Sequence, residues 1–382
     1  MKHKTLNTLL IIIICVSNIF SYDLSNGRIK TKSYSFDKNN NSYIHFNDSL
    51  FHVITNLSND KFLNKRSIVL TIDKNLKILE NKNIIDENNL ILSGIKLKND
   101  NYLFIGHSRS SNDEWNKILL VKTDKNFNLI WKKNYGADNF DCKGYSVQEK
   151  NSNEYLILGY TKASKNNVLL IKVDSNGDEK WFSYLPNLKC TFANQMLYEN
   201  QNEIIIAGQN EKSIFVSKID SVGNIIWNYN LNDNLNSYNI YDIKKTNDDG
   251  YIIIGNTNYN RLNKKDILIL KIKKNGIEEW RQIFGNKYSE VVYDIEETLE
   301  GNFIMCGFYI KNKKNQYCSF ITKVNNQGQK IDQIALDFIE SNRLYDISIK
   351  THLNKYEIFG IGNIESNDST KIFTIQFEDD FN

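Results

Sequence analysis

The chain has 382 residues, of which 41% are hydrophobic and 24% are charged. Its 48 Lys and Arg residues nearly balance its 45 Asp and Glu residues, so the formal net charge is only +3. This balance excludes the strong basic excess that is typical of nucleic-acid-binding proteins. We therefore expect no nucleic-acid partner.

The first 21 residues have the pattern of a secretory signal. Lys2 and Lys4 precede an apolar stretch from Leu9 to Val16, and the small residue Ser21 stands at a suitable cleavage point. The apolar stretch is short for a membrane span, and no later segment approaches the ~18 apolar residues that a spanning helix needs. The sequence thus predicts a mature chain of residues 22–382, without a transmembrane segment, that is secreted, periplasmic or extracellular.

A repeat runs through the rest of the chain. An aromatic or large apolar residue is followed four positions later by a small residue, seven times, at intervals of 47 to 53 residues. A period of this length built from short apolar runs is typical of β-propeller blades. The seven pairs are Phe51/Thr55, Tyr102/Gly106, Tyr155/Gly159, Ile204/Gly208, Tyr251/Gly255, Phe303/Gly307 and Tyr356/Gly360.

The clearest repeat unit lies between Tyr238 and Phe284. It contains four short runs, alternating or wholly apolar, separated by turn residues, and this pattern predicts four strands. A continuous apolar run such as Ile267 to Ile272 indicates burial on both faces, as expected for sheets stacked face to face around an axis. We interpret each repeat as one four-stranded blade.

A second signature marks the turn between the third and fourth strands. Asp124, Asp174 and Asp220 each precede a tryptophan by seven residues. Asp can bond its own turn backbone, and glycine accepts the positive φ that a tight turn needs. We expect the tryptophans to pack between blades, because a buried indole removes a large area from water. The tryptophans are Trp131, Trp181, Trp227 and Trp280, and the glycines are Gly177, Gly223, Gly276 and Gly328.

The two ends of the mature chain are expected to close the ring. The seventh repeat ends after its third strand, at residues 371–377, and a spare strand lies between Gly27 and Phe36. Pairing of these segments would remove the open sheet edges. We therefore predict one all-β domain, a seven-bladed β-propeller of four-stranded antiparallel blades whose last blade is closed by the N-terminal strand.

Two motifs resemble the repeat of secreted bacterial β-propeller proteins, many of them from Bacteroidetes. They are DDG-YIIIG at Asp248 to Gly255 and K-x-D-x-x-G-x-x-x-W at Lys172 to Trp181. The resemblance covers essentially the whole mature chain. It implies the propeller fold, and it implies no particular activity, because most proteins of that group are uncharacterised.

Three aspartates are the sharpest candidates for a functional site. Asp242, Asp294 and Asp346 each follow a tyrosine and are spaced 52 residues apart. They fall in the first strand of consecutive blades, and that strand faces the central channel of a propeller, so the carboxylates are expected to converge there. The corresponding positions of earlier blades hold Ser93, Ser146 and Gln195.

These carboxylates allow three interpretations. They can hold a divalent cation or a ligand, they can raise one another's pKa and supply a general acid, or they can simply satisfy backbone donors at blade junctions. The even spacing follows from the repeat and does not decide among them. Asp346 is expected one residue out of register relative to its glycine, Gly360. No cofactor other than such a cation is expected.

The loops between second and third strands supply further candidates. Trp115 lies in one such polar loop, where an aromatic side chain can stack on a sugar or contact a protein, or can pack against its own loop. Basic residues in the loops of the fifth and sixth blades can attract an acidic glycan or protein, or can serve only to solvate the surface. These basic residues are Arg261, Lys264, Lys265, Lys311, Lys313 and Lys314.

Four cysteines follow the signal segment, and none forms a C-x-x-C pair, so no zinc site is expected. Export permits disulfides between Cys306 and Cys318 and between Cys142 and Cys190. Buried thiols are the alternative.

We therefore expect an exported, monomeric, non-catalytic binding or scaffolding module that recognises a protein or a glycan through its loop face or channel mouth. The alternative is a hydrolase or lyase that acts on polysaccharide with Asp242, Asp294 and Asp346 at its centre.

Overall fold

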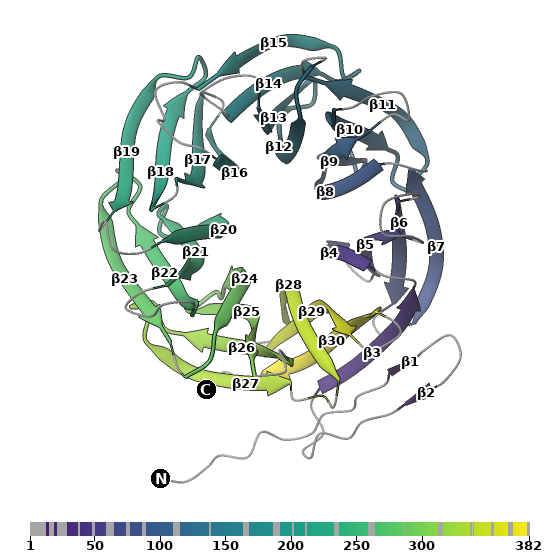
Figure 1. The fold of residues 1–382 in the computed structure, drawn as a ribbon, viewed down its shortest axis with the longest axis vertical. Coiled ribbons are helices and arrows are strands. Elements are labelled where there is room, and N and C mark those ends of the chain that lie inside the picture. The colour runs from purple at the N-terminus through teal and green to yellow at the C-terminus, as the bar shows by residue number, and fades with distance from the viewer. Residues whose placement is uncertain are drawn as a thin grey trace.

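The computed structural model describes residues 13–14, 19–20, 29–36, 39–47, 50–58, 65–73, 77–85, 89–109, 115–136, 139–162, 168–185, 192–200, 202–210, 212–232, 237–258, 264–285, 287–311, 316–336, 338, 340–352, 355–365 and 370–379. All regular elements in these ranges are β-strands. Within the same ranges no helix is long and apolar enough to cross a membrane. Figure 1 shows seven four-stranded sheets arranged in a ring around a central opening. The predicted seven-bladed β-propeller is confirmed.

Each blade runs from an innermost first strand to an outermost fourth strand, as Figure 1 shows. The first strands of blades 1 to 7 are β4 (Asn39–Asn47), β8 (Asn89–Lys96), β12 (Cys142–Asn151), β16 (Phe192–Asn200), β20 (Tyr238–Lys245), β24 (Glu290–Glu297) and β28 (Ser341–His352). The second strands are β5 (Leu50–Ser58), β9 (Tyr102–Ser108), β13 (Glu154–Thr161), β17 (Glu203–Gln209), β21 (Tyr251–Thr257), β25 (Phe303–Ile310) and β29 (Lys355–Glu365). The third strands are β6 (Lys65–Asp73), β10 (Lys117–Thr123), β14 (Val168–Asp174), β18 (Ser213–Asp220), β22 (Asp266–Ile272), β26 (Tyr317–Val324) and β30 (Thr370–Asp379). The fourth strands are β7 (Ile78–Ile85), β11 (Leu129–Tyr135), β15 (Glu179–Tyr184), β19 (Ile225–Asn232), β23 (Glu278–Phe284), β27 (Lys330–Leu336) and β3 (Ile29–Phe36).

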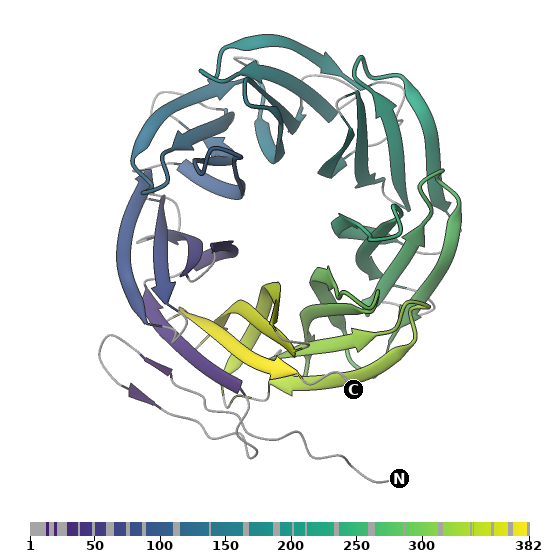
Figure 2. The ribbon, with the colours of Figure 1, turned by 180° about the vertical axis from the view of Figure 1, so that it is seen from behind.

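The seventh blade combines both ends of the chain. The N-terminal strand β3 pairs antiparallel with β30, from Ile29 opposite Phe377 to Phe36 opposite Thr370. Figures 1 and 2 show the purple β3 beside the yellow β30 from both sides of the ring. The predicted closure is therefore confirmed. Two further short strands, β1 (Ile13–Ile14) and β2 (Ile19–Phe20), pair with each other in the segment that we predict to be a signal.

The apolar core lies between blades. One cluster joins Leu103 and Ile118 of blade 2 to Val147 and Ile157 of blade 3, and similar clusters join the later neighbours. Every residue of β21 and β22 is buried, because these strands bury both faces against adjacent sheets. Burial of apolar area is the main favourable term in folding, so each blade depends on its neighbours for stability.

The turns between third and fourth strands have the predicted chemistry. The Asp174 carboxylate accepts hydrogen bonds from the backbone N–H groups of Asn176 and Asp178, both at 2.9 Å. Asp124 and Asp220 accept the equivalent bonds in their own turns. The side chain therefore fixes the turn locally. The glycines Gly177, Gly223, Gly276 and Gly328 all have positive φ.

The tryptophans pack between blades, as predicted. The Trp131 indole N–H of blade 2 donates to the Ser175 carbonyl of blade 3 at 3.1 Å. A Cβ added at Gly177 would lie 3.1 Å from the Trp131 ring, so the ring lies against the turn of the next blade. Gly276 meets Trp227 and Gly328 meets Trp280 in the same way, while Trp181 packs against the cluster between blades 3 and 4.

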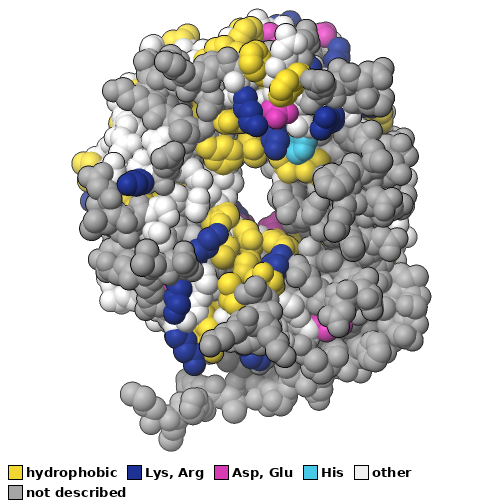
Figure 3. All heavy atoms as spheres, viewed as in Figure 1, with side chains coloured by type: hydrophobic (Ala, Val, Ile, Leu, Met, Phe, Trp, Pro, Cys, Tyr) yellow, Lys and Arg dark blue, Asp and Glu magenta, His cyan; other side chains and the backbone are white. Residues whose placement is uncertain are grey.

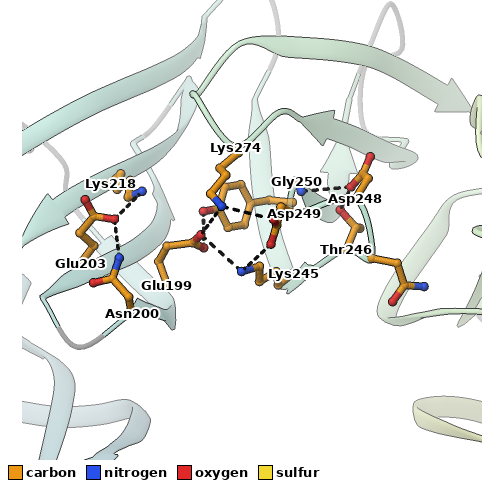
Figure 4. Close-up of polar contacts among 12 residues, drawn as sticks. Glu199, Asn200, Glu203, Lys218, Lys245, Thr246, Asp248, Asp249, Gly250 and Lys274 are labelled. Atoms are coloured by element: carbon orange, nitrogen blue, oxygen red, sulfur yellow. Dashed lines mark hydrogen bonds and ion pairs between the residues drawn. The ribbon is translucent and has the colours of Figure 1, made fainter.

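A polar network reinforces one of these junctions (Figure 4). Glu199 lies near the end of the first strand of blade 4 and is surrounded by residues of blade 5. Its carboxylate accepts a hydrogen bond from the Tyr251 hydroxyl at 2.6 Å and lies 3.3 Å from the Lys245 ammonium. Lys245 and Lys274 also pair with Asp249, at 2.9 and 3.2 Å. The network therefore joins blades 4 and 5 on the side of the ring that carries the turns between third and fourth strands.

The cysteine side chains that the structure describes are buried thiols. Cys306 lies in β25 and Cys318 in the adjacent β26, but their strand partners are Ile321 and Tyr309. Cys142 is also a buried thiol, beside the Thr161 hydroxyl. Neither of the disulfides that export would permit forms, and the buried-thiol alternative holds for these three residues. Cys190 lies outside the described residues.

We expect Gly328→Ala to destabilise the protein more than Gly301→Ala. Both glycines have a φ of 77°, so both substitutions carry about 1–2 kcal/mol of backbone strain. A Cβ at Gly328 would lie 2.5 Å from the Trp280 ring, whereas the nearest atom at Gly301 is 3.9 Å away. Displacing the ring should cost about 1–3 kcal/mol more. Urea unfolding of the two variants measures the difference, and equal losses would refute the role of the Trp280 contact.

Candidate functional site

Every innermost strand carries a β-bulge at the same place. In blades 5, 6 and 7 the extra residues are Tyr241, Tyr293 and Tyr345, each inserted just before the predicted aspartate. A bulge redirects the side chain of the extra residue and often lies beside a functional site. The extra residues of blades 1 to 4 are Asn41, Leu92, Tyr145 and Asn194.

Tyr241, Tyr293 and Tyr345 form a continuous row, which we call the tyrosine row. The ring centroids of Tyr241 and Tyr293 are 5.2 Å apart, and those of Tyr293 and Tyr345 are 5.0 Å apart. All three side chains are half-buried. Because each comes from the innermost strand of a different blade, the row follows the wall of the channel across blades 5, 6 and 7.

Two further rings and a guanidinium extend this row. The Phe308 ring lies 5.8 Å from Tyr293 and 5.0 Å from Tyr317. The Arg343 guanidinium lies 3.8 Å from the centre of the Tyr317 ring and 5.4 Å from that of Phe308, which are cation–π distances. Positive charge is thus fixed beside an aromatic surface.

This surface opens on the face seen in Figure 3. Phe308 is near the end of β25, Tyr317 begins β26, and Arg343 is near the start of β28, so all three lie at the same end of the channel. Hydrophobic side chains gather beside the central opening in this view, and Lys and Arg side chains surround them. We call this end the channel mouth.

The structure brings the three predicted aspartates together. The Lys244 ammonium lies 2.9 Å from an Asp294 carboxylate oxygen and 3.7 Å from one of Asp242, and it also pairs with Glu296. Asp294 is further hydrogen-bonded with Asp346. The carboxylates thus converge as predicted, and a lysine ammonium lies among them.

Asp294 also holds backbone groups at a blade junction. One of its carboxylate oxygens accepts the Ile295 N–H and the other accepts the Ile347 N–H of blade 7, both at 2.8 Å. At the corresponding position of blade 4, the Gln195 amide donates to the Tyr241 carbonyl of blade 5 at 2.7 Å. The position therefore links neighbouring blades whether or not it carries a charge, which favours the structural interpretation.

Burial and charge act in opposite directions on these groups. Burial raises the pKa of Asp242 well above its usual value, and the nearby Asp294 carboxylate raises it further although Lys244 opposes this. Burial alone would also raise the pKa of Asp294, but the Lys244 ammonium and the hydrogen bonds with Asp346 and Ile347 bring it below its usual value. Asp294 is therefore the ionised member of the pair, and Asp242 retains its proton more readily.

The expected register of Asp346 was wrong. Asp346 pairs with Ile361 just after the bulge, and Leu344 pairs with Gly362 just before it. In blade 5 the same places are taken by Asp242 opposite Ile254 and by Ile240 opposite Gly255. Gly362, and not Gly360, is thus the equivalent glycine, because the pairing of β28 with β29 continues further past the aspartate, to His352 opposite Lys355, than the pairing of β20 with β21 does. Asp346 is in register with the other two aspartates.

A cation in the channel gains no support from this geometry. Among the described side chains, no group of three or more His, Cys, Asp or Glu residues is arranged to hold a metal ion. The Lys244 ammonium supplies positive charge where a divalent cation would otherwise balance the carboxylates.

The loop candidates lie apart from the aspartates. Trp115 is 37% exposed, and the next residue, Asn116, is held by the Asp141 carboxylate through two hydrogen bonds. Lys264 and Lys265 are exposed and Lys311 is half-buried. Arg261, Lys313 and Lys314 lie outside the described residues.

The basic loops of blades 5 and 6 are neighbours, as predicted. The Lys265 N–H donates to the Ser289 hydroxyl at 3.0 Å, and the Ile310 N–H, next to Lys311, donates to the Ser289 carbonyl at 2.9 Å. Lys264 donates to the carbonyl of Lys287, whose own ammonium lies 5.0 Å from the centre of the Tyr288 ring. These lysines therefore share one part of the loop face.

Sequence reasoning missed the aromatic part of the site. The sequence shows a tyrosine before each aspartate, but the aspartates were predicted as the site residues because they can ionise. Tyr145 stands in the same way before Ser146. Phe308, Tyr317 and Arg343 gave no signal, since only the fold brings the two sides of the junction between blades 6 and 7 together.

No family model matches the chain, and no curated protein matches it. Among solved structures, the polysaccharide lyase Uly1 aligns over 97% of this chain and 97% of its own length, with 10% identity and a TM-score of 0.52. The core factor of S. cerevisiae aligns over 92% of this chain, with 10% identity and a TM-score of 0.46. Prolyl oligopeptidase B from Galerina marginata aligns over 87%, with 10% identity and a TM-score of 0.47. This chain spans about half the length of the last two, 57% and 48%. These similarities concern the fold alone.

We expect Lys244→Met to destabilise the protein, and to do so more at pH 8 than at pH 5. Removing one partner of a buried ion pair leaves uncompensated charge, which costs about 3 kcal/mol. Burial already raises the pKa of Asp242 and of Glu296, and loss of the ammonium raises both further. When the pKa of a carboxyl is higher in the folded than in the unfolded state, the protein loses stability as the pH rises through the folded-state pKa. It regains this stability in acid.

Urea unfolding at the two pH values measures this effect. Lys133→Met is the matched control, because the Lys133 ammonium lies 3.0 Å from Asp178 with both side chains exposed. Such a pair contributes less than about 1 kcal/mol. A Lys244→Met loss that equals the control, or that does not change with pH, would contradict the assigned role.

Proposed function

We propose that the protein is a non-catalytic binding module that holds an acidic glycan at the channel mouth. The observation that carries the proposal is the tyrosine row with Arg343 beside it. A sugar ring presents a face of C–H groups that packs on aromatic rings, and phenol hydroxyls can bond sugar hydroxyls. Half-buried tyrosines on rigid strands offer both kinds of contact with little loss of side-chain freedom.

The charges around the mouth support an anionic ligand. Arg343 lies within the aromatic surface, and Lys264, Lys265, Lys287 and Lys311 lie on the same loop face. Guanidinium groups bind carboxylates and sulfates through paired, charge-assisted hydrogen bonds. Among the acidic groups of the channel, Asp294 is buried and pairs with the Lys244 ammonium. The raised pKa of Asp242 and of Glu296 reduces the negative charge of these two groups, so the cluster repels such a ligand less than free carboxylates would. The signal-like residues 1–21 support the same proposal, because an exported protein meets extracellular glycans.

The alternative of a polysaccharide-acting enzyme has less support. Asp294 already bonds two backbone N–H groups and Lys244, so its lone pairs are engaged. Burial raises the pKa of Tyr241 and of Tyr293, so both phenols stay protonated at neutral pH. A general acid or base works best with a pKa near the operating pH. The activity of the polysaccharide lyase Uly1 belongs to a protein that shares only 10% identity with this chain, so it does not favour the enzyme alternative.

We expect Tyr293→Leu to weaken binding of oligogalacturonate about tenfold, the loss that corresponds to one good aromatic contact. Leucine keeps apolar volume at the blade junction but removes the ring and hydroxyl. Isothermal titration calorimetry measures the affinity. The matched control is Phe182→Leu, because Phe182 is a 55% exposed aromatic residue on the outermost strand β15, away from the channel.

The result has two clear readings. Loss of affinity in Tyr293→Leu with an unchanged Phe182→Leu would support the proposal. If neither oligogalacturonate nor heparin binds the unsubstituted protein at millimolar concentration, the glycan proposal fails, and a protein partner becomes the better hypothesis.

A second substitution separates binding from catalysis. We expect Asp294→Asn to lower the melting temperature, because the neutral amide weakens the contact with Lys244 and offers one acceptor oxygen in place of two. The expected loss is about 2 kcal/mol. Glycan affinity should stay within about twofold, since Asp294 is buried below the mouth. Turnover of a polysaccharide that disappears in Asp294→Asn at unchanged stability would establish the enzyme alternative.

A further inference from the structure

We propose that the channel wall from blade 3 to blade 7 forms an arc of consecutive subsites, which binds several successive units of an acidic glycan chain. This inference rests on the proposed glycan-binding function and extends it from a single contact to an oligomeric ligand. It predicts that chain length is recognised as well as charge.

A second aromatic group begins the arc in blades 3 and 4. The Tyr145 ring lies 4.8 Å from Phe192 in an edge-on arrangement, and Tyr160 lies 6.1 Å from the same ring. Tyr145 is the bulge residue of β12, so it occupies in blade 3 the position that the tyrosine row occupies in blades 5 to 7. All three side chains are half-buried. They lie at the mouth end, since Tyr160 is near the end of β13 and Phe192 begins β16.

Blade 4 connects this group to the tyrosine row. Its bulge residue is Asn194, whose amide donates to the Ile240 carbonyl of blade 5 at 3.0 Å. The adjacent Gln195 donates to the Tyr241 carbonyl. These bonds hold blades 4 and 5 together at the wall and place a polar side chain between two aromatic groups. A polar position between rings suits the hydroxyl groups that a glycan presents between its apolar faces.

The spacing of the rings suits a chain. Neighbouring centroids in the tyrosine row are 5.2 and 5.0 Å apart, which is close to the length of one sugar unit in an extended chain. The arc is confined to one side of the channel, because the bulge positions of blades 1 and 2 hold Asn41 and Leu92. A bound chain would therefore follow one wall, with the other side left to water.

Both ends of the arc carry a cation at the same position. Lys143 precedes the bulge residue Tyr145 by two positions, and Arg343 precedes Tyr345 by two. Lys143 is the strand partner of Tyr160, and Arg343 lies over Tyr317. In blades 5 and 6 the same position holds Asn239 and Val291. Two cations separated by an uncharged aromatic stretch match an acidic group at each end of a chain of several units.

The test compares oligosaccharides of increasing length. We expect the affinity for oligogalacturonates to rise from two to six units in calorimetric titrations. Tyr145→Leu should leave the affinity for the disaccharide unchanged and lower that for the hexasaccharide about tenfold. Tyr293→Leu should lower both. Heparin oligosaccharides form a parallel series, which distinguishes sulfate from carboxylate as the acidic group.

A second variant tests the arc in case Tyr145→Leu fails to fold. Lys143→Met removes a charge from a half-buried side chain, so it should fold normally while lowering hexasaccharide affinity and its salt dependence. Melting curves confirm folding, and Phe182→Leu remains the control. An affinity that does not change with length, or an equal effect of Tyr145→Leu on both lengths, overturns the arc but leaves the glycan site. Failure of every oligosaccharide to bind overturns the proposed function itself.

Discussion

Burial of both faces of every sheet is the constraint on which this structure depends. Strands such as β21 and β22 are apolar on either side, so no blade can keep its surface from water alone. Each sheet must therefore pack against a neighbour on both faces. A row of such sheets leaves its first and last faces exposed unless the row closes into a ring. The tryptophan that packs on the turn of the next blade, the Glu199 network and the pairing of β3 with β30 all serve this requirement. The ring is thus a consequence of packing, and the channel is a consequence of the ring.

The innermost strands carry a position at which the repeat varies from blade to blade. Their inward edge meets the channel and not another sheet, and a bulge in each of them inserts one extra residue at the channel wall. Asparagine, leucine and tyrosine all occupy this position in different blades, so packing does not dictate the choice. The residues that follow the bulge behave differently. Gln195 and Asp294 both reach the backbone of the next blade, which ties them to the architecture.

The fold could be read from the sequence because its determinants are local and repeated. The glycine turns, the tryptophans seven residues after an aspartate, and the missing fourth strand of the last repeat each have a direct physical meaning. The channel aspartates show the limit of this reasoning. Their convergence follows from the repeat, but their role depends on Lys244 among them and on the Ile347 N–H of another blade. The expected register of Asp346 was wrong for a similar reason, since the longer pairing of β28 with β29 places Gly362, and not Gly360, at the equivalent position. The position of a bulge and a contact between blades cannot be predicted from the spacing of residues in the sequence.

The way the ring closes also governs the order in which the molecule can be completed. Strand β3 leaves the ribosome before every other blade strand, whereas its partner β30 is made after all of them. Six blades have all their strands in sequence order and can assemble as the chain grows, because domains form progressively during synthesis. The seventh cannot. Strand β3 must stay available until β30 has been made. Because the entropy cost of closing a loop rises only slowly with its length, this late pairing remains feasible despite the distance along the chain. The final pairing then gives the seventh blade its fourth strand and closes the ring.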